Sequence, residues 1–362
     1  MGREKIALVG FRLNRGGAER VMATLSNFFD SKGFEVYIII VLDDIKYPHS
    51  GTVINLGKLK GKTNGLLNKI KRFHHFNKCM KQNDFDFIID FRFRRKIIQE
   101  LLIAKFVYRA KTMFTVHHSK IHEYMPNFSP LTRLMYSNSH AIVSIAKSME
   151  NKIKDKHKLE NVVNIFNPID IPFILDKAKE DIELKFDYII GAGHFDTNIK
   201  QFDLLIKAYA ESILPKKEIH LVILGVGKLK EHLLAIAREL NVEQYIHLIG
   251  FKDNPFKYMR RAKYFVLSSK IEGFPMVLLE ALACSTPVVA FDCQTGPNEM
   301  IINNENGLLI EDQNFNKLIE GMNTLVKDEE LYLNCKKNAL ASVKRFSIDV
   351  IGKQWLDLIN KN

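Results

Sequence analysis

The sequence of 362 residues is poor in cysteine and has no long hydrophobic run. Its four cysteines form no C-x-x-C motif and lie at no metal-ligand spacing from a histidine; they are Cys79, Cys284, Cys293 and Cys335. This pattern favours the reduced thiols of a cytoplasmic protein over disulfides or a zinc site. No apolar segment approaches the roughly 20 residues of a membrane-spanning helix, and the N-terminus lacks the apolar core and cleavage site of a signal peptide. We therefore expect a cytoplasmic location.

Acidic residues are absent from residues 45–83, although the whole chain carries 41 of them against 53 lysines and arginines. The positive excess lies in the N-terminal half: residues 1–170 contain 29 basic and 15 acidic residues, and residues 171–362 contain 24 and 26. Within the acid-free segment, apolar residues recur at three- and four-residue spacing, which predicts an amphipathic helix over residues 63–82. The basic residues of the segment are Lys46, Lys58, Lys60, Lys62, Lys69, Lys71, Arg72, Lys78 and Lys81.

This basic segment has two interpretations. In the first, residues 46–81 lie on an anionic membrane surface or beside the phosphate of a lipid-linked acceptor, so that the protein is peripheral on the inner face of the cell membrane. In the second, an ordinary helix packs its apolar side inward and leaves its lysines in solvent. Nucleic acid is not an expected partner, because no nucleic-acid-binding motif accompanies the charge.

Short apolar strands alternate with helix-length segments in both halves of the chain, which predicts an α/β protein with two doubly wound parallel sheets facing a central cleft. Asn-Pro at residues 167–168 interrupts the pattern, so we expect a linker over residues 166–182 between domains at 1–168 and 180–346. A C-terminal helix at 347–362 is expected to pack back on the first domain. The expected strands are residues 5–11, 35–42, 85–91, 112–117, 140–146, 186–193, 219–225, 245–251, 264–269, 287–292 and 307–310, and the expected helices of the second half are 201–213, 228–240, 275–284 and 314–339.

Glycines mark three turns at which such sheets bind anions. Gly16 and Gly17 precede an expected helix, whose free N–H groups and dipole suit a phosphate. Gly191 and Gly193 end a strand, with Lys200 at the mouth of the next helix. The alternatives are a plain tight turn and a solvated lysine. Gly225 and Gly227 lack the third glycine of a dinucleotide fingerprint and indicate a turn.

The segment IEGFPMVLLEALACSTPVVAFD, residues 271–292, places glutamates eight positions apart at Glu272 and Glu280. Glu272 follows an expected strand and can accept hydrogen bonds from a sugar, while the helix start at Gly273, Phe274, Pro275 and Met276 can offer backbone amides to an oxygen ligand. Glu280 falls within an apolar helix, where an unpaired carboxylate is costly. A ribose diol and a neighbouring cationic side chain are both open as its partner.

These motifs resemble the Glu-x7-Glu segment of the retaining glycosyltransferases of family 4. The resemblance also includes GGAER near the N-terminus, NIFNPID at the linker, HLVILGVGKLKEHL, IHLIGFKDNPFKYM and NNENGLLI, so that it covers nearly the whole chain. It implies a GT-B fold with a nucleotide-sugar, UDP-linked by preference, held by the C-terminal domain. It also implies a glycan or lipid-linked glycan acceptor on the N-terminal domain, no obligatory metal and no cofactor. Family members of similar length with GGAER often build lipid-linked oligosaccharides or surface polysaccharides such as lipopolysaccharide.

The resemblance assigns roles to individual residues. As catalytic residues it implies Lys200 at the diphosphate, Glu272 at the transferred sugar, and His117 at the end of the FTVHHS strand. For donor binding it implies Gly16 and Gly17, the backbone of Gly273, Phe274, Pro275 and Met276, Glu280 at the ribose, and Glu299 after the last glycine. A structural hydrogen-bonding role is the alternative for His117, and His118, expected to contact the acceptor, is the alternative to it at the reacting centre. Apart from the resemblance, FRFRRKI places Arg92, Arg94 and Arg95 at a strand end, where they either meet an acceptor pyrophosphate or lie in a solvated loop.

One position departs from the family pattern, because His194 stands where an arginine is usual. A histidine makes at most a pH-dependent contact with a diphosphate, whereas an arginine is always charged. Three alternatives follow: His194 binds the donor when protonated, Arg12 or Arg15 compensates, or the donor binds weakly.

Lys200 and helix-end amides would stabilise the leaving diphosphate. We expect the acceptor hydroxyl to attack from the front face while that phosphate takes its proton.

The competing interpretations of the function are a nucleotide-sugar epimerase of the same fold and a non-catalytic partner of a polysaccharide assembly complex.

Overall fold

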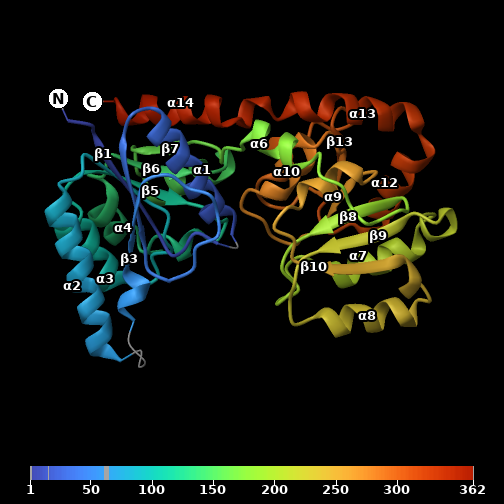
Figure 1. Ribbon diagram of the computed structural model, residues 1–362, viewed down its shortest axis with the longest axis horizontal. Helices are drawn as coiled ribbons and strands as arrows, with labels where there is room; N and C mark the ends of the chain where they lie inside the picture. The colour runs from blue at the N-terminus through green and yellow to red at the C-terminus, as the bar shows by residue number, and fades with distance from the viewer. Residues whose placement is uncertain (1, 15, 61–64, 362) are drawn as a thin grey trace. The chain divides into compact units, whose positions relative to one another are not determined.

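The computed structural model describes residues 2–14, 16–60 and 65–361, which divide into two compact units (Figure 1). Unit 1 comprises Met1–Ile169 and Ile348–Asn362, and unit 2 comprises Asp170–Ser347. Among the described residues, no helix combines the length and the apolar character needed to cross a bilayer.

Unit 1 contains a seven-stranded sheet in the order β3-β2-β1-β4-β5-β6-β7. All of its strand pairs are parallel, and most strands are buried on both faces, which explains their continuous apolar sequences. The strands are β1 Lys5–Gly10, β2 Glu35–Ile40, β3 Thr52–Asn55, β4 Phe87–Asp90, β5 Lys111–Val116, β6 Ala141–Ser144 and β7 Val162–Asn164.

The helices of unit 1 lie on both sides of this sheet. Figure 1 shows α2, α3 and α4 on one side, away from α1 and α14. The helices are α1 Gly17–Ser31, α2 Leu66–Asn83, α3 Ile97–Leu102, α4 Ser129–Tyr136, α5 Lys147–His157 and α14 Ile348–Ile359, with the 3-10 turns η1 Leu56–Leu59 and η3 Ile121–Glu123 and the π-helical turn η2 Ile103–Val107.

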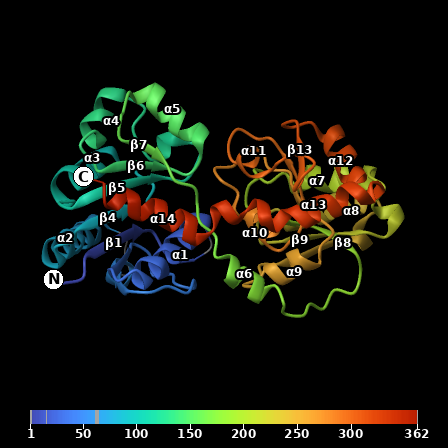
Figure 2. The ribbon, with the colours of Figure 1, turned by 90° about the horizontal axis from the view of Figure 1, so that it is seen from above.

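The C-terminal helix α14 belongs to unit 1 and packs on α1 (Figure 2). Its Gly352 lies against the ring of Phe28, since a Cβ atom at this position would come within 2.3 Å of the Phe28 Cζ. His140 also reaches the helix, with its Nε2 2.7 Å from the carbonyl oxygen of Leu358. Helix α14 thus contributes buried side chains to the core of the first unit.

Unit 2 contains a six-stranded parallel sheet in the order β10-β9-β8-β11-β12-β13. With the sheet of unit 1, it confirms the predicted architecture of two doubly wound α/β units. Its strands are β8 Tyr188–Ala192, β9 His220–Leu224, β10 Ile246–Gly250, β11 Phe265–Leu267, β12 Val288–Phe291 and β13 Gly307–Ile310. Its helices are α6 Ile171–Lys177, α7 Phe202–Glu211, α8 Lys230–Glu239, α9 Phe256–Arg261, α10 Met276–Ala283, α11 Pro297–Met300, α12 Phe315–Lys327 and α13 Glu329–Ser342, with the 3-10 turns η4 Pro215–Lys217, η5 Glu243–Tyr245 and η6 Lys344–Phe346.

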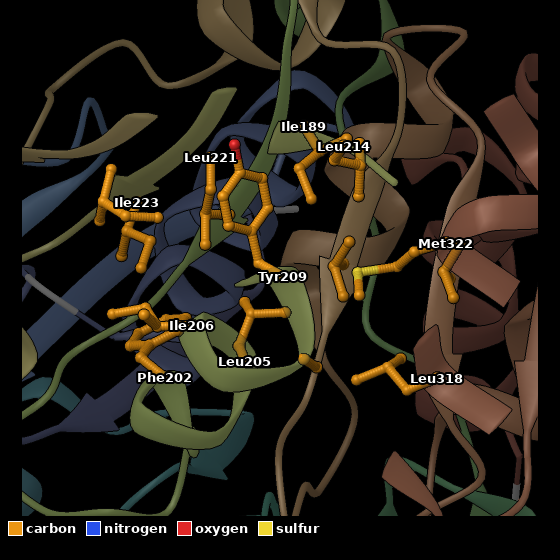
Figure 3. Close-up of a cluster of buried hydrophobic side chains, with 14 of the residues drawn as sticks. Ile189, Phe202, Leu205, Ile206, Tyr209, Leu214, Leu221, Ile223, Leu318 and Met322 are labelled. Atoms are coloured by element: carbon orange, nitrogen blue, oxygen red, sulfur yellow. The ribbon is translucent and has the colours of Figure 1, made fainter. Parts of the chain in front are cut away.

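The core of unit 2 joins side chains of β8 and β9 to those of α7 and α12 (Figure 3). Tyr209 lies in this cluster with its hydroxyl donating to the carbonyl oxygen of Ile219 at 2.8 Å, so its one polar atom is satisfied inside the core. This packing holds the carboxyl ends of β8 and β9 in fixed positions.

The expected helix over residues 314–339 is wrong as a single element, because it is divided into α12 and α13. The break occurs at Asp328, whose carboxylate accepts a hydrogen bond of 2.9 Å from the backbone N–H of Leu331. Asp328 therefore caps the N-terminus of α13 and stops α12. The short strands β3 and β7 were also not expected from the sequence.

Helix α2 has features of both interpretations of the basic segment. Phe76, Cys79 and Met80 are buried against the unit, as in an ordinary surface helix. Leu67 and Ile70, by contrast, are 83% and 56% exposed at its N-terminal end. Lys62 lies outside the described residues.

A buried charge cluster closes the carboxyl end of β4. The guanidinium of Arg92 lies 2.7 Å from a carboxylate oxygen of Asp90 and 3.0 Å from one of Glu100, and all three side chains are almost completely buried. Burial alone would raise the pKa of Asp90, but the charges of Arg92 and Arg94 outweigh it and hold that pKa below its usual range. The fold therefore depends on a matched set of interior charges.

Replacing Arg92 with leucine is expected to lower the free energy of unfolding by roughly 3–5 kcal/mol, because Asp90 would remain charged in the interior without its partner. Urea denaturation measures this loss. Arg95→Leu is the matched control: the side chain of Arg95 is 66% exposed, so its loss should cost less than about 1 kcal/mol. Equal losses in the two variants would contradict a structural role for the cluster.

Candidate functional site

The strand order of unit 2 reverses between β8 and β11. Both β9 and β10 lie on one side of β8, and the chain then returns to place β11 on its other side. In doubly wound sheets, ligands bind at the carboxyl ends of the two strands that flank such a reversal. The turns after β8 and β11 are therefore the expected ligand site of this unit.

The turn after β8 is built on close backbone contact between glycines. The N–H of Gly193 donates to the carbonyl oxygen of Leu224 at 2.9 Å, and a Cβ atom at Gly225 would overlap the carbonyl oxygen of Gly193. A side chain at Gly193 would come within 3.0 Å of the Lys200 Cε. The glycines thus leave room for Lys200 to cross the end of the sheet.

Lys200 and Glu272 meet at this strand reversal. The Lys200 Nζ lies 2.6 Å from the Glu272 Oε1, and the side chains are 22% and 11% exposed. Lys200 follows β8 and Glu272 follows β11, so the ion pair joins the two turns that flank the reversal. The Ser268 hydroxyl donates to the backbone carbonyl of Lys200 at 2.8 Å and holds the same turns together.

The Glu-Gly-Phe-Pro turn leads from Glu272 into helix α10. Pro275 is the residue before the helix, which begins at Met276 without a side-chain cap. The ring of Phe274 turns inward against Phe346, at 5.7 Å between centroids. The Thr295 hydroxyl donates to the backbone carbonyl of Glu272 at 2.5 Å. The uncapped helix start and the fixed turn together provide backbone N–H groups for an oxygen ligand, although Pro275 has none to donate.

The remaining donor residues predicted in unit 2 have different surroundings. Glu280 lies inside α10 and is 5% exposed. His194 is exposed on the turn after β8. Glu299 lies in α11, and its backbone carbonyl accepts a hydrogen bond of 2.6 Å from Arg345. Of the predicted set in this unit, the structure brings Lys200 and Glu272 into direct contact.

In unit 1, Gly16 and Gly17 stand at the start of α1, as expected from the sequence. Glu19 was not predicted to lie here. Its carboxylate folds back over the helix start, where a Cβ atom of Gly16 would overlap it. Burial raises the pKa of Glu19 above its ordinary value. Arg12 lies 3.9 Å from Glu19 and 3.5 Å from Asp44, while Arg15 lies outside the described residues. The spacing G-x-x-E, as in a capping box, could have indicated this contact.

His117 follows β5 and stacks on Phe91, with 5.3 Å between ring centroids. Both of its ring nitrogens are buried and have no hydrogen-bond partner among the described residues. Burial, and to a smaller extent the charge of Arg94, lower the pKa of His117 to about 3, so the imidazole is neutral at physiological pH. The neighbouring His118 accepts a hydrogen bond of 3.0 Å from the backbone N–H of Lys120.

The arginines predicted to bind the acceptor separate into two groups. Arg92 forms the buried cluster with Asp90 and Glu100. Arg94 is 2% exposed and donates to the carbonyl oxygens of Tyr124 and Thr115 at 2.8 and 2.9 Å. The N–H donors of Arg92 and Arg94 are thus used inside the unit, which leaves Arg95 as the candidate acceptor ligand among the three. Arg95 is exposed, pairs with Glu123, and lies 5.1 Å from the ring of Phe93.

A pocket of about 370 Å³ opens at the strand reversal of unit 1, between β1 and β4. Its walls combine aromatic rings with cationic side chains from the ends of the strands and from α2 and α3. The aromatic members are Phe11, Phe73, Phe76 and Phe93, and the exposed or half-buried cationic members are Lys69, Arg72, Arg95 and Lys96. This composition suits a ligand with both an anionic and an apolar part.

Comparison with protein families gives two matches that together span most of the chain. The family described as "Glycosyl transferases group 1" matches residues 173–341. The family described as "Glycosyltransferase Family 4" matches residues 15–172.

Two proteins of Campylobacter jejuni resemble this chain over nearly its full length. The first is the N-acetylgalactosamine-N,N'-diacetylbacillosaminyl-diphospho-undecaprenol 4-alpha-N-acetylgalactosaminyltransferase, which is 34% identical over 95% of this chain and 96% of its own length. The second is the GalNAc-alpha-(1->4)-GalNAc-alpha-(1->3)-diNAcBac-PP-undecaprenol alpha-1,4-N-acetyl-D-galactosaminyltransferase, 25% identical over 98% of each chain.

Solved structures share the fold of this chain over nearly its full length. Anabaena Alr3699/HepE in complex with UDP and glucose superimposes with a TM-score of 0.79 at 19% identity, covering 99% of this chain and 100% of that one. The lipopolysaccharide outer core galactosyltransferase WaaB gives a TM-score of 0.72 at 19% identity, covering 98% and 99%. With the full-length relative from Campylobacter jejuni, these matches show that the chain belongs to the glycosyltransferases of GT-B fold.

Proposed function

We propose that this protein is a retaining glycosyltransferase that moves a sugar from a UDP-sugar to a lipid-linked oligosaccharide or polysaccharide precursor at the cytoplasmic face of the membrane. The observation that carries the proposal is the contact of Lys200 with Glu272 at the strand reversal of unit 2. It combines a cation suited to a diphosphate with a carboxylate suited to sugar hydroxyls.

In this proposal Lys200 changes partner when the donor binds. Without donor, its ammonium group is paired with Glu272 at 2.6 Å. A diphosphate carries more negative charge than one carboxylate and would attract the lysine more strongly. Glu272 would then be free to accept hydrogen bonds from hydroxyls of the sugar, and the turn would not need to move to form the donor site.

Transfer of the sugar develops positive charge on its anomeric carbon and negative charge on the departing phosphate. Lys200 and the N–H groups at the start of α10 are proposed to stabilise the departing phosphate. The acceptor hydroxyl attacks from the face that the phosphate leaves, and the phosphate oxygen takes its proton. This mechanism forms no covalent glycosyl-enzyme intermediate, so it needs no carboxylate as a nucleophile. The two-carboxylate scheme of glycoside hydrolases therefore does not apply.

His117 is proposed to contact the transferred sugar or the acceptor as a neutral imidazole. Its buried nitrogens have no partner among the described residues, so a hydroxyl group of a ligand would satisfy a polar group that is otherwise costly to bury. Its lowered pKa means that it would act as a neutral hydrogen-bonding group and not as a cation.

The pocket of unit 1 is proposed to hold the acceptor. Its cationic members would contact an acceptor diphosphate, and its aromatic walls would cover the apolar group next to that diphosphate. The named substrates of the two Campylobacter jejuni relatives have this chemistry, because both contain a diphosphate joined to undecaprenol.

A thermal-shift panel of UDP-, GDP- and ADP-sugars tests the donor. A ligand that binds only the native state raises the melting temperature. UDP-sugars at 100 times their Kd should raise the free energy of unfolding by about 2.7 kcal/mol. Incubation with donor alone should leave the sugar unchanged, whereas an epimerase would convert it. The absence of a shift with every nucleotide-sugar would favour the non-catalytic partner instead.

Lys200→Met and Glu272→Gln are each expected to lower turnover by at least about 100-fold, because each removes a group proposed to act on the reacting sugar or its leaving phosphate. Initial-rate assays measure this loss, with far-UV circular dichroism to confirm the fold. The matched control is Lys270→Met, which removes an exposed lysine from the same turn and should change turnover by less than about twofold. Near-normal turnover in either site variant would refute the assignment.

His117 is expected to make the fold sensitive to acid. Its folded-state pKa of about 3 lies below the ordinary value of 6.5, so its contribution to stability is complete above pH 6.5 and declines as the pH falls toward 3. The decline is about 1.4 kcal/mol per pH unit, or about 2 kcal/mol at pH 5. Urea denaturation at pH 7.5 and pH 5.0 should show a smaller loss for His117→Phe than for the unmodified protein. An identical pH dependence of the two proteins would mean that His117 does not titrate in this way.

A further inference from the structure

Helix α3 runs directly into the π-helical turn η2, and this segment has an apolar face that the unit leaves uncovered. Ile98, Leu102 and Phe106 are 78%, 43% and 67% exposed. Since they are spaced four residues apart, they lie along one side of the helical segment. Isolated exposed apolar residues are common on protein surfaces, but an aligned row of large ones marks an interaction site.

The opposite side of the same segment is fully used by the fold. Ile103 and Val107 are 1% and 3% exposed, and Glu100 is held by Arg92. Glu100 and Ile103 also line the pocket of unit 1. One helical segment therefore forms a wall of the proposed acceptor pocket on its inner side and exposes Ile98, Leu102 and Phe106 on its outer side.

The surroundings of the exposed row are cationic. Between residues 91 and 122 the only acidic residue is Glu100, which is buried, whereas Lys96, Arg109 and Lys111 are exposed. The turn η2 contacts both α2 and α4, and Figures 1 and 2 show these helices beside α3. They extend the apolar surface with Leu67 and Ile70 from α2 and Leu134 from α4, which are 83%, 56% and 57% exposed.

We propose that this face docks on an anionic lipid bilayer, with Ile98, Leu102 and Phe106 inserted between the headgroups. The row of apolar side chains flanked by lysines and arginines is the pattern by which helices bind at a membrane interface, and the missing exposed acid removes repulsion from anionic headgroups. The inference rests on the proposed function in one respect: docking through α3 would bring the pocket beside the interface at which a lipid-linked diphosphate is exposed. The inserting side chains come from α3 and η2, whereas the lysines of the neighbouring basic segment 46–81 would add electrostatic attraction.

Flotation of the purified protein with vesicles tests the proposal. Vesicles of phosphatidylcholine with 30% phosphatidylglycerol should bind the protein at least about tenfold more strongly than vesicles of phosphatidylcholine alone. The triple variant Ile98→Ser, Leu102→Ser, Phe106→Ser should lose at least about tenfold in binding to the anionic vesicles. A triple variant that replaces exposed apolar residues elsewhere, Ile302→Ser, Leu333→Ser, Val350→Ser, is the matched control and should bind within about twofold of the unmodified protein.

Three outcomes would overturn the proposal: no binding of the unmodified protein to anionic vesicles, unchanged binding of the α3–η2 variant, or a dimer in lipid-free solution that this variant dissociates. The last outcome would assign the face to a second copy of the chain. The thermal shift with UDP separates this proposal from the proposed function, because the α3–η2 variant should keep the full shift while losing the vesicles. Vesicle binding by a protein that shows no UDP shift would support the docking face and count against the enzymatic function.

Discussion

The ion pair of Lys200 and Glu272 lies where the sheet of unit 2 reverses its strand order. The two residues are 72 positions apart in the chain, and only the adjacency of β8 and β11 brings their turns together. The Lys200 and Glu272 side chains are only partly exposed and lie 2.6 Å apart, so each neutralises the charge of the other at this candidate site. The glycine turn, the Ser268 hydrogen bond and the Thr295 hydrogen bond all act on this pair, since each fixes the backbone of one of its members.

The sheet of unit 1 has the same kind of strand reversal, but different side chains lie at it. Its strand order reverses between β1 and β4, and the pocket at that reversal is lined by aromatic rings and cations in place of a lysine–glutamate pair. Two buried arginines stabilise the backbone next to this pocket. Arg92 pairs with interior carboxylates, and Arg94 donates hydrogen bonds to backbone carbonyl oxygens. Two candidate ligand sites of different character thus lie at corresponding places in two related sheets.

The two parallel sheets and the turns that carry Lys200 and Glu272 could be predicted because they depend on local sequence. The direct pairing of the two side chains could not, because it depends on the adjacency of β8 and β11, which are far apart in the chain. Continuous apolar strands between helical segments define the parallel sheets, and Glu-Gly-Phe-Pro after a strand defines a turn at a carboxyl end. The burial of Arg92 and Arg94 could not be predicted, because the local sequence around an arginine at a strand end does not show whether it contacts solvent or interior polar groups. Asp328 shows a similar limit: its capping contact interrupts a helical pattern that is otherwise continuous in sequence. The exposed row on α3 and η2 could not be predicted either. The segment IIQELLIAKFV has apolar residues on every side of a helix, so the sequence does not show which side the fold buries.

In the proposed mechanism, the partly buried lysine of unit 2 exchanges its carboxylate partner for the diphosphate of the donor. A crystal structure of the chain with UDP bound tests this exchange. A diphosphate oxygen is expected within about 3 Å of the Lys200 Nζ, beside the turn that carries Glu272. UDP bound with no phosphate oxygen within hydrogen-bonding distance of Lys200, while the ion pair with Glu272 remains intact, would contradict it.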